Sequence, residues 1–176
     1  MVTFVKGDIF KSPAQVLTNT VNCVGVMGKG VALEFKNRYP QMFNDYKSKC
    51  DQGNVKPGQP YLWEDDSTQV LNFPTKRNWR DKSLLQDIED GLKHLASSYE
   101  QMGIQSIAMP ALGCGLGGLK WSEVQPLIVK HLGSISDLDV YVYEPQNVAA
   151  IKDDTEERDA NTQAGEEKLS ARQPEA

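Results

Sequence analysis

The sequence predicts an α/β fold in three layers, with helices on both faces of a central mixed, largely parallel sheet. Three observations predict it. Short apolar runs of strand length alternate with amphipathic helical patterns, which is typical of parallel strands joined by helices. Two runs near the middle are separated only by a short polar turn and form an antiparallel hairpin. Two glycine-rich loops, Asn22 to Gly30 and Gly113 to Gly118, follow apolar runs, where such sheets place their ligand sites.

The first fifty residues predict two strands and two helices. Val2 to Phe10 alternates apolar and polar residues around a tight turn at Gly7-Asp8, and Gln15 to Val21 is the second strand. Pro40 should terminate or kink the first helix, and Gly53 stops the second. The apolar stripes of the two helices are Val31, Phe35 and Tyr39, and Phe43, Tyr46 and Cys50.

The remaining elements follow in the same alternation. The hairpin strands are Tyr61 to Trp63 and Gln69 to Phe73. A helix then starts at a capping box and stops at Gly103, and a second capping box, with Pro126 tolerated in the first turn, starts the last helix. The capping boxes are Ser83 to Gln86 and Ser122 to Gln125; the stripe of the earlier helix is Leu85, Ile88, Leu92, Leu95 and Tyr99; the last two strands are Ile104 to Met109 and Leu138 to Tyr143.

Charge divides the chain into a domain, residues 1–145, and an acidic polar tail, residues 146–176. Residues 151–176 hold eight acidic and four basic side chains and no aromatic one, so we expect a disordered tail or a linker. That segment carries a net charge of −4 out of the −5 of the whole chain, which leaves residues 1–150 at −1. The acidic balance therefore does not argue against a nucleic-acid partner.

Cysteine and histidine usage predicts a reduced cytoplasmic protein without a metal or cofactor. Three widely spaced cysteines, no secretory signal and no apolar run of membrane-spanning length are typical of that compartment. The two histidines, His94 and His131, fall in predicted helices and do not cluster with cysteines at metal-ligand spacing. We expect a monomer that does not associate with membranes.

The two glycine loops predict a ligand with two phosphates. A glycine loop that opens into a helix points unpaired backbone N–H groups and the positive end of the helix dipole at an anion. Gly113, Gly115 and Gly118 also match a dinucleotide-binding fingerprint, but only one strand remains after them, which disfavours that reading. A Walker A loop fails because Gly30 follows Lys29 where that motif needs Ser or Thr.

Several side chains near the loops have two interpretations. Cys23 and Cys114 are better explained as small residues beside glycines than as nucleophiles, because no histidine is near in sequence to make a thiolate. Asn19 and Asn22 fit turn chemistry or a contact with ligand hydroxyls equally well. Lys29 is either a phosphate contact or a solvated lysine, and Asp8 is slightly better explained as a turn aspartate.

A basic and aromatic run, Thr75 to Lys82, follows the second hairpin strand. Taken alone, such a run is more often a solvated loop than a binding site. Beside a ligand cleft, its composition suits single-stranded nucleic acid, because cations contact the phosphate backbone and an aromatic ring stacks on bases. The candidate DNA-binding residues are Arg77, Trp79 and Arg80.

These segments together resemble the macrodomain family, small α/β/α domains that bind ADP-ribose. The resemblance covers Val2 to about Pro145 and rests on V-K-G-D-I at 5 to 9, N-x-V-N-C at 19 to 23 and P-A-L-G-C-G-L-G-G at 110 to 118. T-K at 75 and 76 and M-G-K-G-V-A at 27 to 32 are similar to one branch of the family. That branch holds terminal ADP-ribose glycohydrolase and, closer still, the DNA ADP-ribosyl glycohydrolase antitoxins of the DarT-DarG type.

The resemblance implies a role for each candidate site residue. Lys76 would be catalytic, Asn22 would orient the distal ribose, and Asp8 and Ile9 would hold the adenine, with Tyr143 against the base. Backbone N–H groups of both glycine loops would wrap the diphosphate. The implied substrate-binding residues are Asp8, Ile9, Thr20, Met27, Gly28, Lys29, Gly30, Val31, Gly113, Cys114, Gly115, Leu116, Gly117 and Tyr143.

The resemblance also implies hydrolysis of ADP-ribose from a base of single-stranded DNA, with a cognate ADP-ribosyltransferase toxin as a partner. Terminal ADP-ribose glycohydrolase pairs its lysine with an aspartate at the position of Gly117, so the missing acid favours the DNA-directed branch. The antitoxins carry a toxin-binding domain after the macrodomain, so this chain is either a fragment cut in a linker or a stand-alone relative. A non-catalytic ADP-ribose reader, a hydrolase of ADP-ribosyl-glutamate and a phosphatase of ADP-ribose 1″-phosphate remain alternatives.

Overall fold

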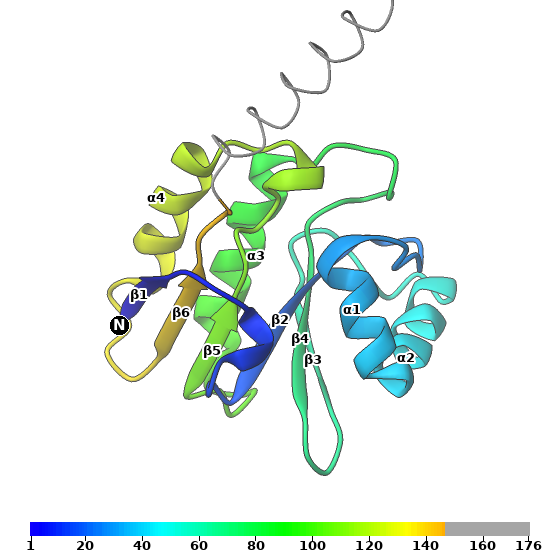
Figure 1. The fold of residues 1–176 in the computed structure, drawn as a ribbon, viewed down its shortest axis with the longest axis horizontal. Helices are drawn as coiled ribbons and strands as arrows, with labels where there is room; N and C mark the ends of the chain where they lie inside the picture. The colour runs from blue at the N-terminus through cyan, green and yellow to red at the C-terminus, as the bar shows by residue number, and fades with distance from the viewer. Residues whose placement is uncertain (147–176) are drawn as a thin grey trace, which may run out of the picture. The chain divides into compact units, whose positions relative to one another are not determined.

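Residues 1–146 are described by the computed structural model, and they contain one six-stranded sheet (Figure 1). The strand order is β1-β6-β5-β2-β4-β3, in which only β3 runs antiparallel to its neighbour. The predicted mixed, largely parallel sheet is therefore confirmed. The strands are β1 Val2–Val5, β2 Val16–Val21, β3 Tyr61–Glu64, β4 Gln69–Pro74, β5 Ser106–Met109 and β6 Asp139–Tyr143.

Two pairs of helices cover the two faces of the sheet. Figure 1 shows α1 and α2 together on one side and α3 with α4 on the other, and each pair encloses an apolar core of its own. This arrangement gives the predicted three layers. The helices are α1 Gly30–Arg38, α2 Pro40–Asp51, α3 Leu85–Ser98 and α4 Trp121–Leu132.

Alternation along β4 explains why both cores form. Val70 belongs to the core under α1 and α2, whereas Leu71 and Phe73 belong to the core under α3 and α4, because successive side chains of a strand point to opposite faces. Gly91 of α3 lies directly on the Phe73 ring, where a side chain would have no room. The glycine therefore lets α3 approach the sheet closely.

Both helix-ending signals in the first half are confirmed. α1 ends at Arg38, and Pro40 is the first residue of α2, where its missing N–H would have no partner in any case. Gly53 follows the end of α2 with φ of +72°, a left-handed conformation that glycine adopts without strain.

The predicted capping boxes are wrong. Lys120 and Leu84 occupy the N-cap positions of α4 and α3, and neither makes a side-chain cap. Ser83 lies one residue before the N-cap Leu84, its side chain is buried, and its backbone N–H donates to Gly117 O at 2.9 Å. Because α4 begins at Trp121, Pro126 lies beyond its first turn and not within it.

The first predicted strand is also shorter than expected. β1 ends at Val5, and Ile9–Lys11 form a single 3-10 turn whose N-cap is Asp8. Met1–Pro145 form one compact unit. The predicted tail falls almost wholly in residues 147–176, outside the described residues, so the domain boundary stays a prediction. In the described part of the chain no helix is long and apolar enough to span a bilayer.

Candidate functional site

The loops that follow five strands meet at one edge of the sheet. β1, β2, β4, β5 and β6 run parallel, so their carboxyl ends share that edge. The Asp8 turn, both glycine loops and the Lys76 loop all follow these strands directly. The sequence-based grouping of these loops at one edge is therefore correct.

Asn22 holds the first glycine loop in shape. Its Oδ1 accepts hydrogen bonds from the backbone N–H groups of Val24 and Val26 at 3.1 and 3.3 Å, and its Nδ2 donates to Val26 O at 2.7 Å. The Tyr46 hydroxyl lies 2.8 Å from the same Oδ1. Asn22 therefore has a local role in the loop, and its contact with a ribose stays a prediction.

Asn19 does not face the ligand edge. Its side chain is fully buried on the α1 and α2 face of the sheet, and its Nδ2 donates to Asn72 Oδ1 at 3.2 Å. The sequence left turn chemistry and a ligand contact open for Asn19; the structure instead places Asn19 inside β2, paired with Asn72 of β4. Met27 is buried beside it, with Sδ 3.8 Å from Asn19 Nδ2, so the Met27 side chain belongs to the core.

The first glycine loop ends at the N-terminus of α1. Lys29 is the N-cap residue, Gly30 has φ of +60°, and the N–H groups of the first turn have no intrahelical acceptor. Gly28, Lys29 and Gly30 are exposed and Val31 is half-buried. A Cβ at Gly30 would lie 3.9 Å from Leu116 Cδ1, so the two glycine loops approach each other here.

The second glycine loop depends on glycine conformations and on close packing. Gly113, Gly115 and Gly118 have φ of +71°, +73° and +77°. A Cβ at Gly113 would lie 2.7 Å from Leu119 Cδ1, and a Cβ at Gly117 would meet the Ser83 side chain. A dinucleotide-binding fingerprint opens directly into a helix. Here Gly113 is followed by a 3-10 turn, Gly115–Gly117, and α4 begins only at Trp121, so the loop does not have the geometry of that fingerprint.

The backbone of Lys76 is fixed against the first glycine loop. The N–H groups of Thr75 and Lys76 donate to Val21 O at 2.9 and 3.4 Å, and Cys23 Sγ lies 3.6 Å from Lys76 O. The half-buried Lys76 side chain reaches Trp79 O with its Nζ at 3.5 Å. Ser83, which follows this loop, donates its backbone N–H to Gly117 O. Residues 75–83 therefore connect the first glycine loop with the second.

The three candidate DNA-binding residues have different surroundings. Arg77 Nε and Nη2 each lie 3.1 Å from an oxygen of Asp87, and these hydrogen bonds raise the pKa of Arg77. Trp79 is 48% exposed, and the Arg80 guanidinium lies over its ring at 4.7 Å. The Trp79 ring is thus accessible from solvent with Arg80 beside it, whereas Arg77 is already paired with Asp87 of α3.

The two loop cysteines are thiols at neutral pH. Burial is the main cause that raises the pKa of Cys23 to about 11, with Cys50 and Asp87 adding to it, and burial raises the pKa of Cys114 to about 11. A nucleophilic cysteine needs a lowered pKa. The structure therefore agrees with the packing interpretation of both residues.

The residues assigned to adenine lie at neighbouring strand ends. Tyr143 pairs with Val5 across β6 and β1, and the exposed Asp8 follows that end of β1. One carboxylate oxygen of Asp8 accepts from Phe10 N–H at 2.9 Å, so the capping interpretation holds, and the other oxygen is left for a ligand. Ile9 is buried and Thr20 is half-buried.

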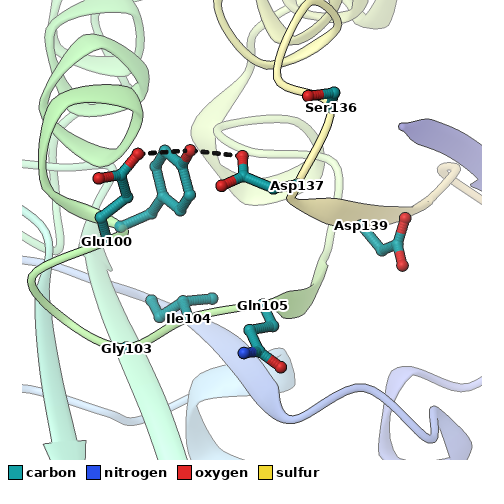
Figure 2. A pocket seen from close by; sticks show the side chains of 8 residues that line it. Glu100, Gly103, Ile104, Gln105, Ser136, Asp137 and Asp139 are labelled. Carbon is teal, nitrogen blue, oxygen red and sulfur yellow. Dashed lines mark hydrogen bonds between the residues drawn. The ribbon is translucent and has the colours of Figure 1, made fainter.

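A separate cavity of about 610 Å³ lies at the opposite edge of the sheet (Figure 2). Tyr99 is one of its lining residues, and the Tyr99 hydroxyl lies 2.6 Å from Asp137 Oδ1 and 3.1 Å from Glu100 Oε1. The cavity borders the amino-terminal ends of β5 and β6, away from the glycine loops. Within residues 1–146 no group of three or more His, Cys, Asp or Glu side chains could hold a metal ion.

The family of the chain follows from this fold and from a direct match. The model of the Macro domain matches residues 18–128. The chain belongs to the macrodomain family.

Relatives that are 41% to 42% identical to the chain are DNA ADP-ribosyl glycohydrolases, whereas more distant relatives include an ADP-ribose glycohydrolase and an ADP-ribose 1″-phosphate phosphatase. The DNA ADP-ribosyl glycohydrolase of Mycobacterium tuberculosis is 42% identical over 149 residues, which are 82% of this chain and 42% of that protein. The solved macrodomain of Mycobacterium tuberculosis DarG has a TM-score of 0.80 at 41% identity, over 83% of this chain and 99% of that one. Thermosipho africanus DarTG in complex with ADP-ribose has a TM-score of 0.79 at 40% identity, over 82% of this chain and 42% of that one.

The chain spans about two fifths of the length of the curated DNA ADP-ribosyl glycohydrolases that it matches.

Sequence reasoning missed three residues that shape the site: Tyr46 behind Asn22, Ser83 behind Gly117 and Asp87 behind Arg77. No local sequence signal marks Asp87, because its burial on α3 and its ion pair with Arg77 form only when the helix packs beside the loop.

Proposed function

We propose that this chain is an ADP-ribosyl glycohydrolase that releases ADP-ribose from a base of single-stranded DNA and so reverses the action of a DNA ADP-ribosyltransferase toxin. The observation that carries the proposal is the position of Lys76. It lies on a loop that is bonded to the first glycine loop at one end and to the second at the other. A cation thus stands beside the two segments best suited to hold a diphosphate.

The binding assignments follow the same geometry. The first-turn amides of α1 and the backbone of Gly113 to Gly117 grip the diphosphate, with glycine conformations that let the chain approach it closely. Asp8 accepts a hydrogen bond from the adenine amine with its free oxygen, beside Ile9 and Tyr143. The Thermosipho africanus DarTG structure contains ADP-ribose, which supports this ligand.

Hydrolysis of the N-glycosidic bond needs an electrophilic ribose carbon and a leaving base. A water oxygen bonds to C1″, the bond from C1″ to the base nitrogen breaks, and its electron pair and one proton go to the base. Lys76 acts either as an ammonium that donates a hydrogen bond to the leaving base, or as a neutral amine that attacks C1″ before water does. Asn22 orients the ribose in both cases.

The substrate class follows from what surrounds Lys76. Gly117 supplies no acid to assist the lysine, and Ser83 occupies the space that a side chain there would need. Trp79 and Arg80, on the same loop, offer an exposed ring and a cation to a nucleic-acid strand. Relatives named DNA ADP-ribosyl glycohydrolase support DNA over protein, and a Thermosipho africanus fusion with a DNA ADP-ribosyl transferase supports a toxin partner. We propose that the domain acts as a monomer.

The test compares Lys76→Ala with wild type on an ADP-ribosylated single-stranded oligonucleotide. We expect the variant to lose release of ADP-ribose while its affinity for free ADP-ribose stays within a few fold, because the lysine acts on the transition state. Gel assays measure release and titration calorimetry measures affinity. Lys93→Ala, an exposed lysine on α3, is the matched control and should keep full activity.

Four outcomes contradict the proposal. Full activity of Lys76→Ala removes the lysine from the mechanism. A wild type that cleaves only ADP-ribosylated glutamate peptides, or that releases phosphate from ADP-ribose 1″-phosphate, has another substrate. Binding of ADP-ribose without turnover of any modified substrate identifies a reader.

A further inference from the structure

An ion pair ties the Lys76 loop to helix α3. Arg77 and Asp87 are joined by two hydrogen bonds of 3.1 Å, in the bidentate arrangement that an arginine fork favours. The Asp87 side chain is only 6% exposed, whereas that of Arg77 is 59% exposed. A buried carboxylate needs a partner, and Asp87 has both Arg77 and the positive end of α3, since it lies in the first turn of that helix.

The backbone of Lys76 and Arg77 is hydrogen-bonded to β2 and to the first glycine loop. Cys23 N–H donates to Arg77 O at 3.2 Å, and Lys76 N–H donates to Val21 O at 3.4 Å. Arg77 therefore holds the start of the first glycine loop with its carbonyl and α3 with its side chain. Lys76, its neighbour, lies between two fixed points.

We propose that Asp87, acting through Arg77, is a positioning residue that fixes where the Lys76 Nζ lies relative to the ribose. The inference rests on the proposed function, because it assumes that Lys76 acts at the scissile bond. The Lys76 ammonium has one long contact, 3.5 Å to Trp79 O, so its own side chain does little to fix its place. Displacement of a reacting group by about 1 Å can lower a rate by about a hundredfold.

A direct contact of Arg77 with the DNA strand is the competing explanation. In that case removal of Asp87 would free the guanidinium for a phosphate, and binding of DNA would improve or stay unchanged. If Arg77 and Asp87 act together on Lys76, loss of either partner harms turnover, and loss of both harms it no further.

The experiment measures kcat and KM on modified oligonucleotide for Asp87→Asn, Arg77→Gln and the double variant. We expect kcat to fall by about a hundredfold in all three, with KM, its salt dependence and ADP-ribose affinity unchanged. Arg77→Lys should recover part of kcat. The control is Glu89→Gln on the same helix, which breaks the ion pairs to Lys130 and His131 instead and should leave kcat unchanged while lowering thermal stability.

Amide hydrogen exchange tests, without substrate, whether the ion pair of Arg77 with Asp87 holds the Lys76 loop in place. Asp87→Asn should speed exchange at the Cys23 and Lys76 amides, and Glu89→Gln should not. Unchanged exchange, a raised KM with normal kcat in Arg77→Gln, or normal kcat in Asp87→Asn would each overturn the inference. A wild type inactive on modified DNA overturns the proposed function, and the exchange result then separately decides whether the tie exists.

Discussion

The two glycine loops lie at the same edge of the sheet but are held by different forces. In the first loop, the Asn22 amide bonds to two backbone N–H groups and one carbonyl, and Tyr46 stands behind it. In the second, glycines at positive φ turn the chain, and Gly113 and Gly117 press on neighbouring side chains. Side-chain hydrogen bonds of Asn22 stabilise the first loop, whereas the second loop combines backbone hydrogen bonds with close contacts at Gly113 and Gly117.

This difference predicts which substitutions each loop tolerates. The first loop should fail when a polar group is removed, because the backbone groups bonded to Asn22 lose their partners. The second loop should fail when a side chain is added at Gly113 or Gly117, because a Cβ at either position would lie too close to a neighbouring side chain. Substitutions that separate polar loss from added volume therefore break or sharpen the comparison.

Asn22→Ala should have the largest effect. It leaves the N–H groups of Val24 and Val26 and the Val26 carbonyl without the amide, and the sum of these losses is about 3 kcal/mol in the free energy of unfolding. Urea unfolding of the ligand-free protein measures it. If Asn22 acted only on ribose, stability without ligand would be unchanged and only turnover would fall.

Gly113→Ala should come next, at about 2 kcal/mol. The φ of +71° disfavours any L side chain, and the new methyl would lie 2.7 Å from Leu119 Cδ1. Gly28→Ala is the matched control in the other loop, because its φ is not positive and its nearest neighbour is Val26 Cγ1 at 3.7 Å. Equal unfolding midpoints in urea for the two variants would contradict the steric explanation of the second loop.

The sequence predicted the elements of this fold well because their signals are local. Apolar periodicity, Pro40 and Gly53 each act within a few residues, and the structure confirms the elements they indicate. The capping box at Ser83 failed because a long-range contact outweighs local preference, whereas the box at Ser122 failed because α4 already begins at Trp121. Ser83 is drawn toward Gly117, thirty-four positions away, and is lost to the helix that it was expected to cap.

The site was predictable in part for the same reason. Glycine loops and a lysine after strands mark the ligand edge, since parallel strands bring their carboxyl ends together. The supporting residues were not visible, because pairs such as Arg77 with Asp87 form only when α3 packs beside the loop. The contrast between Asn19 and Asn22 also needed the structure, since one amide faces the core and the other the loop.

The smallest predicted effect belongs to Tyr46→Phe, which tests how far the first loop depends on polar support from α2. Burial is the main cause that raises the pKa of Tyr46, so its hydroxyl keeps a proton to donate to Asn22. The substitution removes a hydroxyl that lies 2.8 Å from both Asn22 Oδ1 and Asn22 O but almost no volume, so we expect about 1 kcal/mol less stability and a weakening of ADP-ribose binding by two- to fivefold. Urea unfolding and titration calorimetry measure the two quantities. Phenylalanine fills the same space as tyrosine. A larger loss of stability than in Gly113→Ala would therefore mean that the contact with α2 is the main stabilising contact of the first loop. An unchanged free energy of unfolding would mean that Asn22 keeps its position without Tyr46.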